Sequence, residues 1–450
     1  MPSLVLASED IALLVKSIVA DAEAGGSPAA ADGLQRLRSA QHHQPEAAFA
    51  LLHLVDRMAL PRDVGIACLS DIAKSHAEDA EMLSAVGCCL ERVRDIDDLN
   101  SPPPDAPVFR EVIEKLAAMA GLHDGMPDQM QVLRGLATAA RMLGRQYDVI
   151  AESSYRKLTE LAPQDGAQHY NLGLLYKTRG RFVDGMIANQ IAVSLVEEPD
   201  QSYLWNLGIC ATGAGDATTA RDAWRRLGLT IDIGRFGLPE GDFGQCKVKL
   251  AERPLAERTA DCDDPGFEET IWIERLSPCH GVVRSVLYRN LGVDFGDVIL
   301  HDGAPITHHA YGELRIPVFP HLATLRRQNY QMFDFAGTQE TPEQLAELSR
   351  GLDRDAVIYS HSESMVWLCA NCWRSADIDH EHLEKMEAHV VKGRIAAPPD
   401  MTPENLLEMI DKAIAGQTGC RIYAPELCLA AGLAARAQID RRRFDLLTKN

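Results

Sequence analysis

The chain has 450 residues, of which 46% are hydrophobic and 24% charged, and this composition predicts a soluble globular protein of two or three domains. Its formal net charge of -20 argues against nucleic acid as a partner, because nucleic-acid-binding domains usually carry a basic patch. No apolar run is long enough to cross a membrane. The 11 cysteines are odd in number and scattered, which indicates reduced thiols and a cytoplasmic location rather than a disulfide framework.

The first hundred residues are expected to be helical throughout. Glu9 and Asp10 follow Ser8 and no basic segment precedes them, so the stretch predicts an amphipathic helix beginning near Ser8 and not a signal peptide. Apolar residues recur at helical spacing through residues 49–58, 66–72 and 82–90. We interpret residues 1–100 as degenerate helical repeats, which end where Pro102, Pro103 and Pro104 prevent a helix from continuing.

Residues 129–230 contain a repeat with a period of 35 positions. Two Asn-Leu-Gly triplets begin at Asn171 and Asn206. The residues after them correspond at the same period: Gly180 with Gly215, Gly185 with Ala220, and Asn189 with Trp224. This recurrence resembles the tetratricopeptide repeat, and residues 129–163 resemble an earlier copy. The resemblance implies helix pairs that stack side by side and form a groove for a peptide or a partner protein.

The array diverges from the family pattern, so the identity of its ligand does not carry over. His169 and Leu204 stand where the family favours tryptophan, and Asn189 stands where it favours an aromatic residue. Polar residues on the first helix of each pair are the candidate partner contacts: Arg141, Asn171, Lys177 and Asn206. We therefore interpret residues 107–234 as tetratricopeptide-like repeats and the chain as an adaptor that binds a protein or peptide.

The pattern changes after residue 229, where four glycines within eleven residues mark a domain boundary. Short segments rich in β-branched and aromatic residues predict strands at 248–250, 270–276, 281–287, 297–300, 315–319 and 356–360. Helices are expected at 342–350, 380–387, 403–415 and 425–437, with Thr402 as an N-cap. The predicted fold class is therefore an all-α helical-repeat solenoid followed by a mixed α+β domain at residues 245–450.

Cys369, Cys372 and His380 have the spacing Cys-x2-Cys-x7-His, which predicts a zinc site if a fourth ligand joins them. Cys279 is a candidate for that ligand. If residues 380–387 are helical, the ring of His382 points away from that of His380, so only one of them binds the ion. Two alternatives stay open for the cysteine pair: a redox-active dithiol, or two structural thiols without metal.

An enzyme is the alternative to an adaptor. Its C-terminal domain would use a cysteine or metal centre, at Cys279, His361, Cys369 and Cys372, on a protein substrate that the repeats recruit. The motifs of phosphate-binding loops, α/β-hydrolases, zinc proteases and protein kinases are absent from the sequence. An aromatic–basic stretch at residues 325–330 would be the first site to test for nucleic acid, although the net charge favours an ordinary surface edge.

Overall fold

The computed structural model describes residues 6–24, 28–93, 106–341, 343–352, 356–369, 385–417 and 419–448. The chain forms two compact units. The first, here called the helical unit, comprises Met1–Gly241, Arg253–Gly266 and Asp302–Ala323. The second, called the sheet unit, comprises Asp242–Glu252, Phe267–His301 and Thr324–Asn450. Each unit is therefore built from segments that are separated in the sequence.

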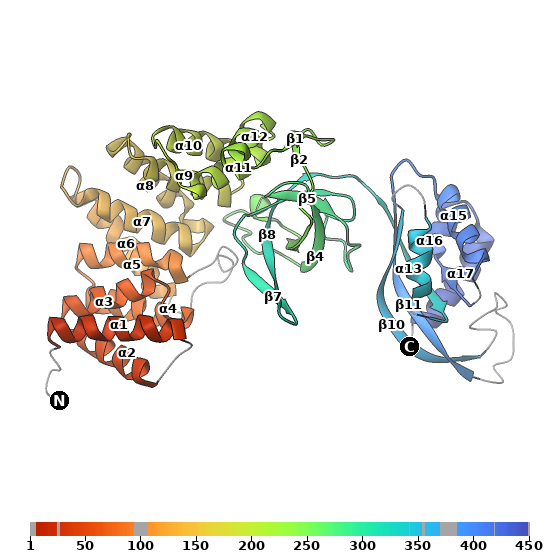
Figure 1. Ribbon diagram of the computed structural model, residues 1–450, viewed down its shortest axis with the longest axis horizontal. Helices are drawn as coiled ribbons and strands as arrows, with labels where there is room; N and C mark the ends of the chain where they lie inside the picture. The colour runs from red at the N-terminus through yellow and green to blue at the C-terminus, as the bar shows by residue number, and fades with distance from the viewer. Residues whose placement is uncertain are drawn as a thin grey trace. The chain divides into compact units, whose positions relative to one another are not determined.

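Helices follow one another through the first part of the helical unit, in red to yellow-green in Figure 1. Their bounds are α1 (Ser8–Ala24), α2 (Pro28–Ala40), α3 (Pro45–Asp56), α4 (Arg62–Ser75), α5 (Ala80–Val93), α6 (Ala106–Leu122), α7 (Gln129–Leu143), α8 (Asp148–Leu161), α9 (Gly166–Thr178), α10 (Phe182–Ser194), α11 (Gln201–Ala214) and α12 (Ala217–Arg226). The predicted helical solenoid is confirmed, and its first described helix begins at Ser8. In the described part of the chain, no helix combines the length and the apolar character that crossing a membrane requires.

The 35-residue period reappears in how the helices begin. The carboxylate of Asp165 accepts a hydrogen bond from the backbone N–H of Ala167 at 3.0 Å, and this caps α9. The carboxylate of Asp200 accepts one from the N–H of Ser202 at 2.8 Å and caps α11 in the same way. Because an N-cap satisfies backbone donors that have no partner within the helix, both copies start their first helix by the same local device.

The same period sets where helices touch. A Cβ atom on Gly173 would overlap the side-chain amide of Asn189, so only glycine lets α9 and α10 come this close. At the equivalent place in the next copy, a Cβ atom on Gly208 would lie 2.5 Å from Cζ2 of Trp224. Asn189 and Trp224, which correspond in sequence, thus make the same contact: each side chain lies on the second helix of its pair and packs against a glycine of the first.

A methyl group at Gly208 is expected to push α11 and α12 apart. In Gly208→Ala, the free energy of unfolding should fall by about 1–3 kcal/mol, the usual cost of overpacking a close contact. The matched control is Gly121→Ala in α6, where nothing lies within 4 Å of the added methyl group. That variant should be unchanged or more stable by up to about 1 kcal/mol, because alanine favours the helix. Urea unfolding followed by helical circular dichroism measures both, and equal losses would contradict the contact.

Antiparallel strands open the sheet unit. They are β3 (Gln245–Ala251), β4 (Glu268–Arg275), β5 (His280–Val283) and β6 (Val298–His301), each paired with the next. A second antiparallel pair, β7 (Thr307–Tyr311) and β8 (Leu314–Arg326), lies mostly within the helical unit. That unit also holds a short ribbon of β1 (Asp232–Ile233) and β2 (Pro239–Glu240). The strands expected at 248–250, 270–276 and 297–300 are present, with bounds that differ from the expected ones by one to three residues.

The rest of the sheet unit alternates strands and helices. Its elements are β9 (Gln331–Gln339), α13 (Glu343–Arg350), β10 (Val357–Cys369), β11 (Lys385–Ala397), α15 (Pro403–Ala415) and β12 (Arg421–Tyr423), followed by α16 (Pro425–Ala430) and α17 (Ala434–Thr448). The sheet order is β10-β11-β9-β12 and the described pairs are antiparallel. A β-α-β-β-α-β succession in this order is the ferredoxin-like arrangement. Phe335, Ile395 and Leu406 join sheet and helices in one core, and Figure 1 shows the helices beside the long ribbon of β10 and β11.

Two predicted helices differ from the structure. The helix expected at 380–387 is wrong at its end, because Lys385 already belongs to β11 and pairs with Cys369; residues 380–384 lie outside the described residues. Pairing with both β10 and β9 outweighs the local helical pattern there. The helix expected at 425–437 is divided into α16 and α17 by Gly432, whose φ of +74° ends a helix. The mixed character of the C-terminal region is confirmed.

Candidate functional site

The four residues predicted to contact a partner lie on α7, α9 and α11. Arg141 is buried and its guanidinium pairs with Glu91 at 2.5 Å. Lys177 is buried and its ammonium lies 2.8 Å from the carboxylate of Asp302. Asn206 is also buried, while Asn171 is half-buried. Their role as partner contacts stays a prediction, but the charges of Arg141 and Lys177 are already compensated within the helical unit.

Later segments of the chain pack against the ends of these helices. Arg145, between α7 and α8, pairs with Asp263 at 2.9 Å and donates to the backbone carbonyl of Leu255. A Cβ atom on Gly303 would lie 2.7 Å from the indole of Trp205, so the backbone beside Asp302 lies directly on that ring. The helical unit therefore covers part of its own repeat surface with residues from Arg253–Gly266 and with Asp302 and Gly303.

An open groove lies elsewhere, between α8, α9 and α10, and has a volume of about 390 Å³. We call it the α8–α10 groove. Apolar, polar and charged residues line it: Arg156, Thr159, Glu160, His169, Leu172, Tyr176, Asp184, Ile187, Ala188 and Ile191. Helices of two successive repeat copies supply these residues, so stacking of the copies creates a groove that no single helix pair contains.

The α10 helix presents an exposed apolar stripe at this groove, and two of its three residues, Ile187 and Ile191, line it. Val183, Ile187 and Ile191 are 56%, 49% and 39% exposed, and their spacing of four residues places them on one helical face. The opposite face buries Phe182 and Ala192 in the helical unit. Sequence reasoning missed this stripe, although the signal was present: a helix that is apolar on all sides needs partners on more than one side.

Ion pairs hold the rim of the α8–α10 groove. The hydroxyl of Tyr176 donates to Glu152 at 3.0 Å and accepts from Arg156 at 3.2 Å. The guanidinium of Arg181 lies 4.3 Å from the Tyr176 ring centroid and pairs with both Glu152 and Asp184 at 2.7 Å. Burial, helped by the hydrogen bond to Glu152, raises the pKa of Tyr176, so its hydroxyl stays a donor. The charged side chains of the rim are thus paired with one another, whereas the apolar side chains of the stripe stay exposed to water.

The Ser277–His280 segment, which contains the candidate Cys279, forms a buried cluster at the start of β5. Ser277, Cys279, His280 and His301 are each 0% exposed. The Ser277 hydroxyl lies 2.5 Å from Nδ1 of His280 and 3.7 Å from the thiol of Cys279. Burial, together with the neighbouring His301, lowers the pKa of His280 to about 3, so the imidazole is neutral at pH 7. A nucleophilic cysteine must reach its substrate, and this burial withholds the Cys279 thiol from solvent.

The predicted metal ligands are only partly within the described residues. Cys369 is the last residue of β10, whereas Cys372 and His380 lie outside the described residues. His361, a candidate of the enzyme alternative, stacks on Tyr288 at 4.3 Å, and its Nε2 lies 2.7 Å from the carbonyl of Val286. Within the described ranges, no group of three or more His, Cys, Asp or Glu residues is placed to hold a metal ion. The zinc site therefore stays a prediction, as does the enzyme alternative.

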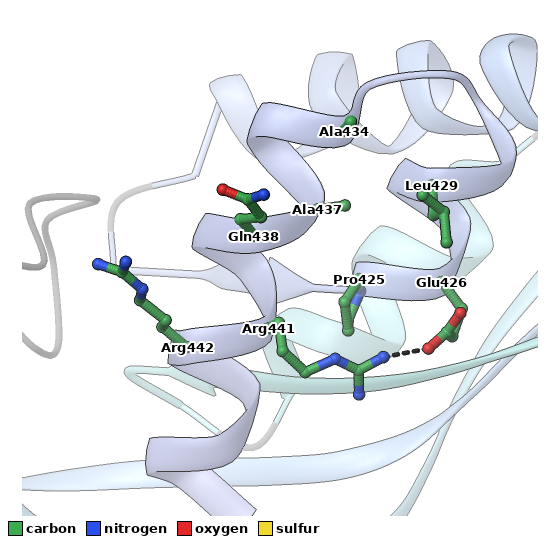
Figure 2. Close-up of a pocket in the computed structure, with 8 residues that line it drawn as sticks. All are labelled: Pro425, Glu426, Leu429, Ala434, Ala437, Gln438, Arg441 and Arg442. Atoms are coloured by element: carbon green, nitrogen blue, oxygen red, sulfur yellow. Dashed lines mark hydrogen bonds and ion pairs between the residues drawn. The ribbon is translucent and has the colours of Figure 1, made fainter.

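A second cavity, of about 450 Å³, lies between α16 and α17 of the sheet unit. Figure 2 shows Pro425 and Leu429 on one side of it and Ala434 and Ala437 on the other. Its charged edge is closed by the ion pair of Arg441 with Glu426. The lining of this cavity is largely apolar, and its described polar side chains do not converge on one point where they could bind a ligand.

Comparisons with known proteins identify no family: no family model matches the chain, and neither does any curated protein. Solved structures resemble it weakly. The type IV pilus biogenesis factor PilW is 13% identical with a TM-score of 0.35, over 49% of this chain and 93% of its own. A MamA protein is 16% identical with a TM-score of 0.27, over 41% and 91%. MamA from Desulfovibrio magneticus RS-1 is 19% identical with a TM-score of 0.28, over 40% and 92%.

Scores at this level carry no argument about function. The tetratricopeptide-like character of the helical unit rests on its own features: the 35-residue period, the aspartate caps of α9 and α11, and the glycine contacts within the helix pairs.

Proposed function

We propose that this protein is an adaptor that binds a partner protein in the α8–α10 groove. The observation that carries the proposal is the stripe of Val183, Ile187 and Ile191, three exposed apolar side chains on one helical face. Contiguous apolar surface of this kind costs free energy in water and marks interaction sites. The groove beside it continues the apolar surface to Leu172 and Ala188.

An amphipathic helix of the partner is the proposed occupant. The stripe repeats every four residues, which matches the spacing of side chains along one face of a second helix. The rim carries both signs of charge, with the side chain of Arg156 58% exposed and that of Asp184 45% exposed. A helix with apolar residues at i and i+4 and charges of both signs on its flanks would complement this surface.

The test replaces Ile187 with aspartate. Helical peptides are first selected from a displayed library on the purified full-length protein, and their affinities are then measured by fluorescence anisotropy. We expect Ile187→Asp to weaken binding at least tenfold, or about 1.4 kcal/mol, because the carboxylate must be desolvated in the apolar groove. The matched control is Val149→Asp on α8, which is 82% exposed and does not line the groove.

Three outcomes would contradict this function: no peptide selected, selected peptides without apolar i and i+4 spacing, or equal weakening by the two substitutions. Sedimentation of the wild type and of Ile187→Asp tests a different occupant. If the wild type self-associates and Ile187→Asp is monomeric, the groove is occupied by a second copy of this chain. The proposal that a different protein binds there would then be wrong.

We also propose that zinc stabilises the sheet unit through Cys369, Cys372 and His380, with Cys279 as the candidate fourth ligand. The Cys-x2-Cys-x7-His spacing supports this, together with the pairing of Cys369 with Lys385, which brings the two ends of the segment between β10 and β11 together. Elemental analysis of the full-length protein should find one zinc per chain, lost in Cys369→Ser/Cys372→Ser. The exposed Cys262→Ser serves as the control and should keep the metal. Absence of zinc from the wild type, or its loss from the control, would refute this ligand set.

A further inference from the structure

A polar cavity of about 460 Å³ lies in the sheet unit, where the loop before β6 meets the loop between β8 and β9. We call it the loop cavity. Its lining includes Asn290, Phe295, Asp297, Arg327, Asn329 and Tyr330. The last three belong to the aromatic–basic stretch at residues 325–330, which the repeat-based function leaves without a role.

The two loops are held together by hydrogen bonds and ring contacts. The carboxylate of Asp297, which is 5% exposed, accepts hydrogen bonds from the backbone N–H of Gln328 at 2.6 Å and of Asp294 at 3.0 Å. The ring of Tyr330 lies on Gly296, whose φ of +87° and lack of a Cβ atom permit that approach. The Tyr330 and Phe295 rings meet edge to face at 5.2 Å. The walls of the cavity are therefore formed before any ligand arrives.

Most charged side chains around the loop cavity already have a hydrogen-bond or ion-pair partner. Arg394 pairs with Asp294 at 2.9 Å and donates to the carbonyl of Leu287 at 3.0 Å. Asp297 is occupied by the two backbone donors. Arg327 differs: it is exposed, and among the described residues its guanidinium makes neither an ion pair nor a hydrogen bond. The charge of Arg327 acts on the nearby carboxylate of Asp297, but among the lining residues its guanidinium is the one without a direct hydrogen-bond or ion-pair partner.

Asn329 adds a second indication. Its φ of +55° places it in the left-handed region, which only one other non-glycine residue, Met58, adopts within the described ranges. Such backbone conformations are costly and concentrate at binding sites, although asparagine tolerates them better than most residues. At this position Asn329 lines the mouth of the cavity beside Arg327.

We propose that the loop cavity binds a nucleotide unit, with Arg327 on its phosphate and its base against Tyr330. A guanidinium binds phosphate through two parallel hydrogen bonds, and an aromatic wall suits a flat base. The amides of Asn290 and Asn329 offer both donors and acceptors for the edge of a base. The volume lies within the range of small-ligand pockets. Arg327 is the one lining arginine without an ion pair, and a single guanidinium favours one phosphate, so a monophosphate is expected to bind better than a triphosphate.

A free mononucleotide and the end of a single strand share this chemistry. The net charge of -20 repels further phosphates, so the free nucleotide is the expected ligand. Isothermal titration of the full chain uses the four nucleoside monophosphates, inorganic phosphate and a short single-stranded oligoribonucleotide as probes. At least one monophosphate should bind at one site per chain, and Arg327→Ala should weaken it at least tenfold. Arg289→Ala is the matched control: Arg289 is exposed, lies over Phe267 and does not line the cavity.

Several results would overturn the proposal. If inorganic phosphate binds as tightly as every nucleotide, the cavity recognises only the anion and not the base. Equal losses in Arg327→Ala and Arg289→Ala would indicate diffuse charge attraction rather than this cavity. An oligoribonucleotide that binds more tightly than any mononucleotide would assign the surface to a strand. If none of the probes binds, the loop cavity is not a nucleotide site. Peptide binding in the α8–α10 groove is measured separately, so failure here does not affect that function.

Discussion

Replacing Lys177 with methionine is expected to lower the free energy of unfolding of the helical unit by about 3–5 kcal/mol, the usual cost of removing one partner of a buried ion pair. The Lys177 ammonium lies 2.8 Å from the Asp302 carboxylate, and the two side chains are 6% and 7% exposed. Methionine preserves much of the shape of lysine but removes the charge. Asp302 would then stay buried, with the backbone N–H of Gly303 as a hydrogen-bond donor at 2.7 Å but without its ammonium partner.

Two comparisons make this result specific. Arg92→Met removes an ion pair with Asp56 whose side chains are 43% and 56% exposed, and it should cost no more than about 1 kcal/mol. Lys177→Met/Asp302→Asn removes both buried charges and should recover most of the lost stability, because neither charge of the ion pair then has to be kept out of water. Urea unfolding followed by circular dichroism gives all values. If Lys177→Met costs no more than Arg92→Met, the pair is not buried in solution.

Acidification is expected to destabilise the sheet unit through His280. An unfolded imidazole titrates near pH 6.5, whereas burial and the neighbouring His301 lower the pKa of folded His280 to about 3. Between these values the unfolded chain holds a proton that the folded chain lacks. Stability from this group is therefore complete above about pH 6.5 and is lost as the pH falls toward 3, at about 1.4 kcal/mol per pH unit.

The measurement is the slope of the unfolding free energy against pH between about pH 6.5 and about pH 4.5. In His280→Gln the slope should be smaller by about 1.4 kcal/mol per pH unit, because the titrating group is gone. Val283→Ala, a truncation of a fully buried residue of β5, controls for destabilisation and should keep the wild-type slope. Identical slopes in wild type and His280→Gln would show that His280 is protonated while folded.

Local signals in the sequence determined much of the fold. The 35-residue period placed the pairs α9–α10 and α11–α12, because the repeated glycines and their facing residues act within one helix pair. Thr402 was expected to cap the next helix, and its hydroxyl accepts a hydrogen bond from the N–H of Asn405 at 3.3 Å. The strand at 297–300 followed from its run of β-branched and aliphatic residues. Each of these features depends on neighbours in sequence, which is why sequence reasoning found them.

Only the tertiary structure decided which side chains are available for function. Lys177 looks like a groove residue in sequence, and Asp302, 125 positions later, buries it. The apolar residues of α10 look like core, yet no described element of the helical unit covers Ile187, which is 49% exposed. Lys385 to Glu387 fit a helical pattern, and pairing with Cys369 and its neighbours makes them a strand. In each case the deciding partner is distant in sequence. Spacing along the chain encodes the faces of an element, whereas the path of the whole chain determines what covers each face.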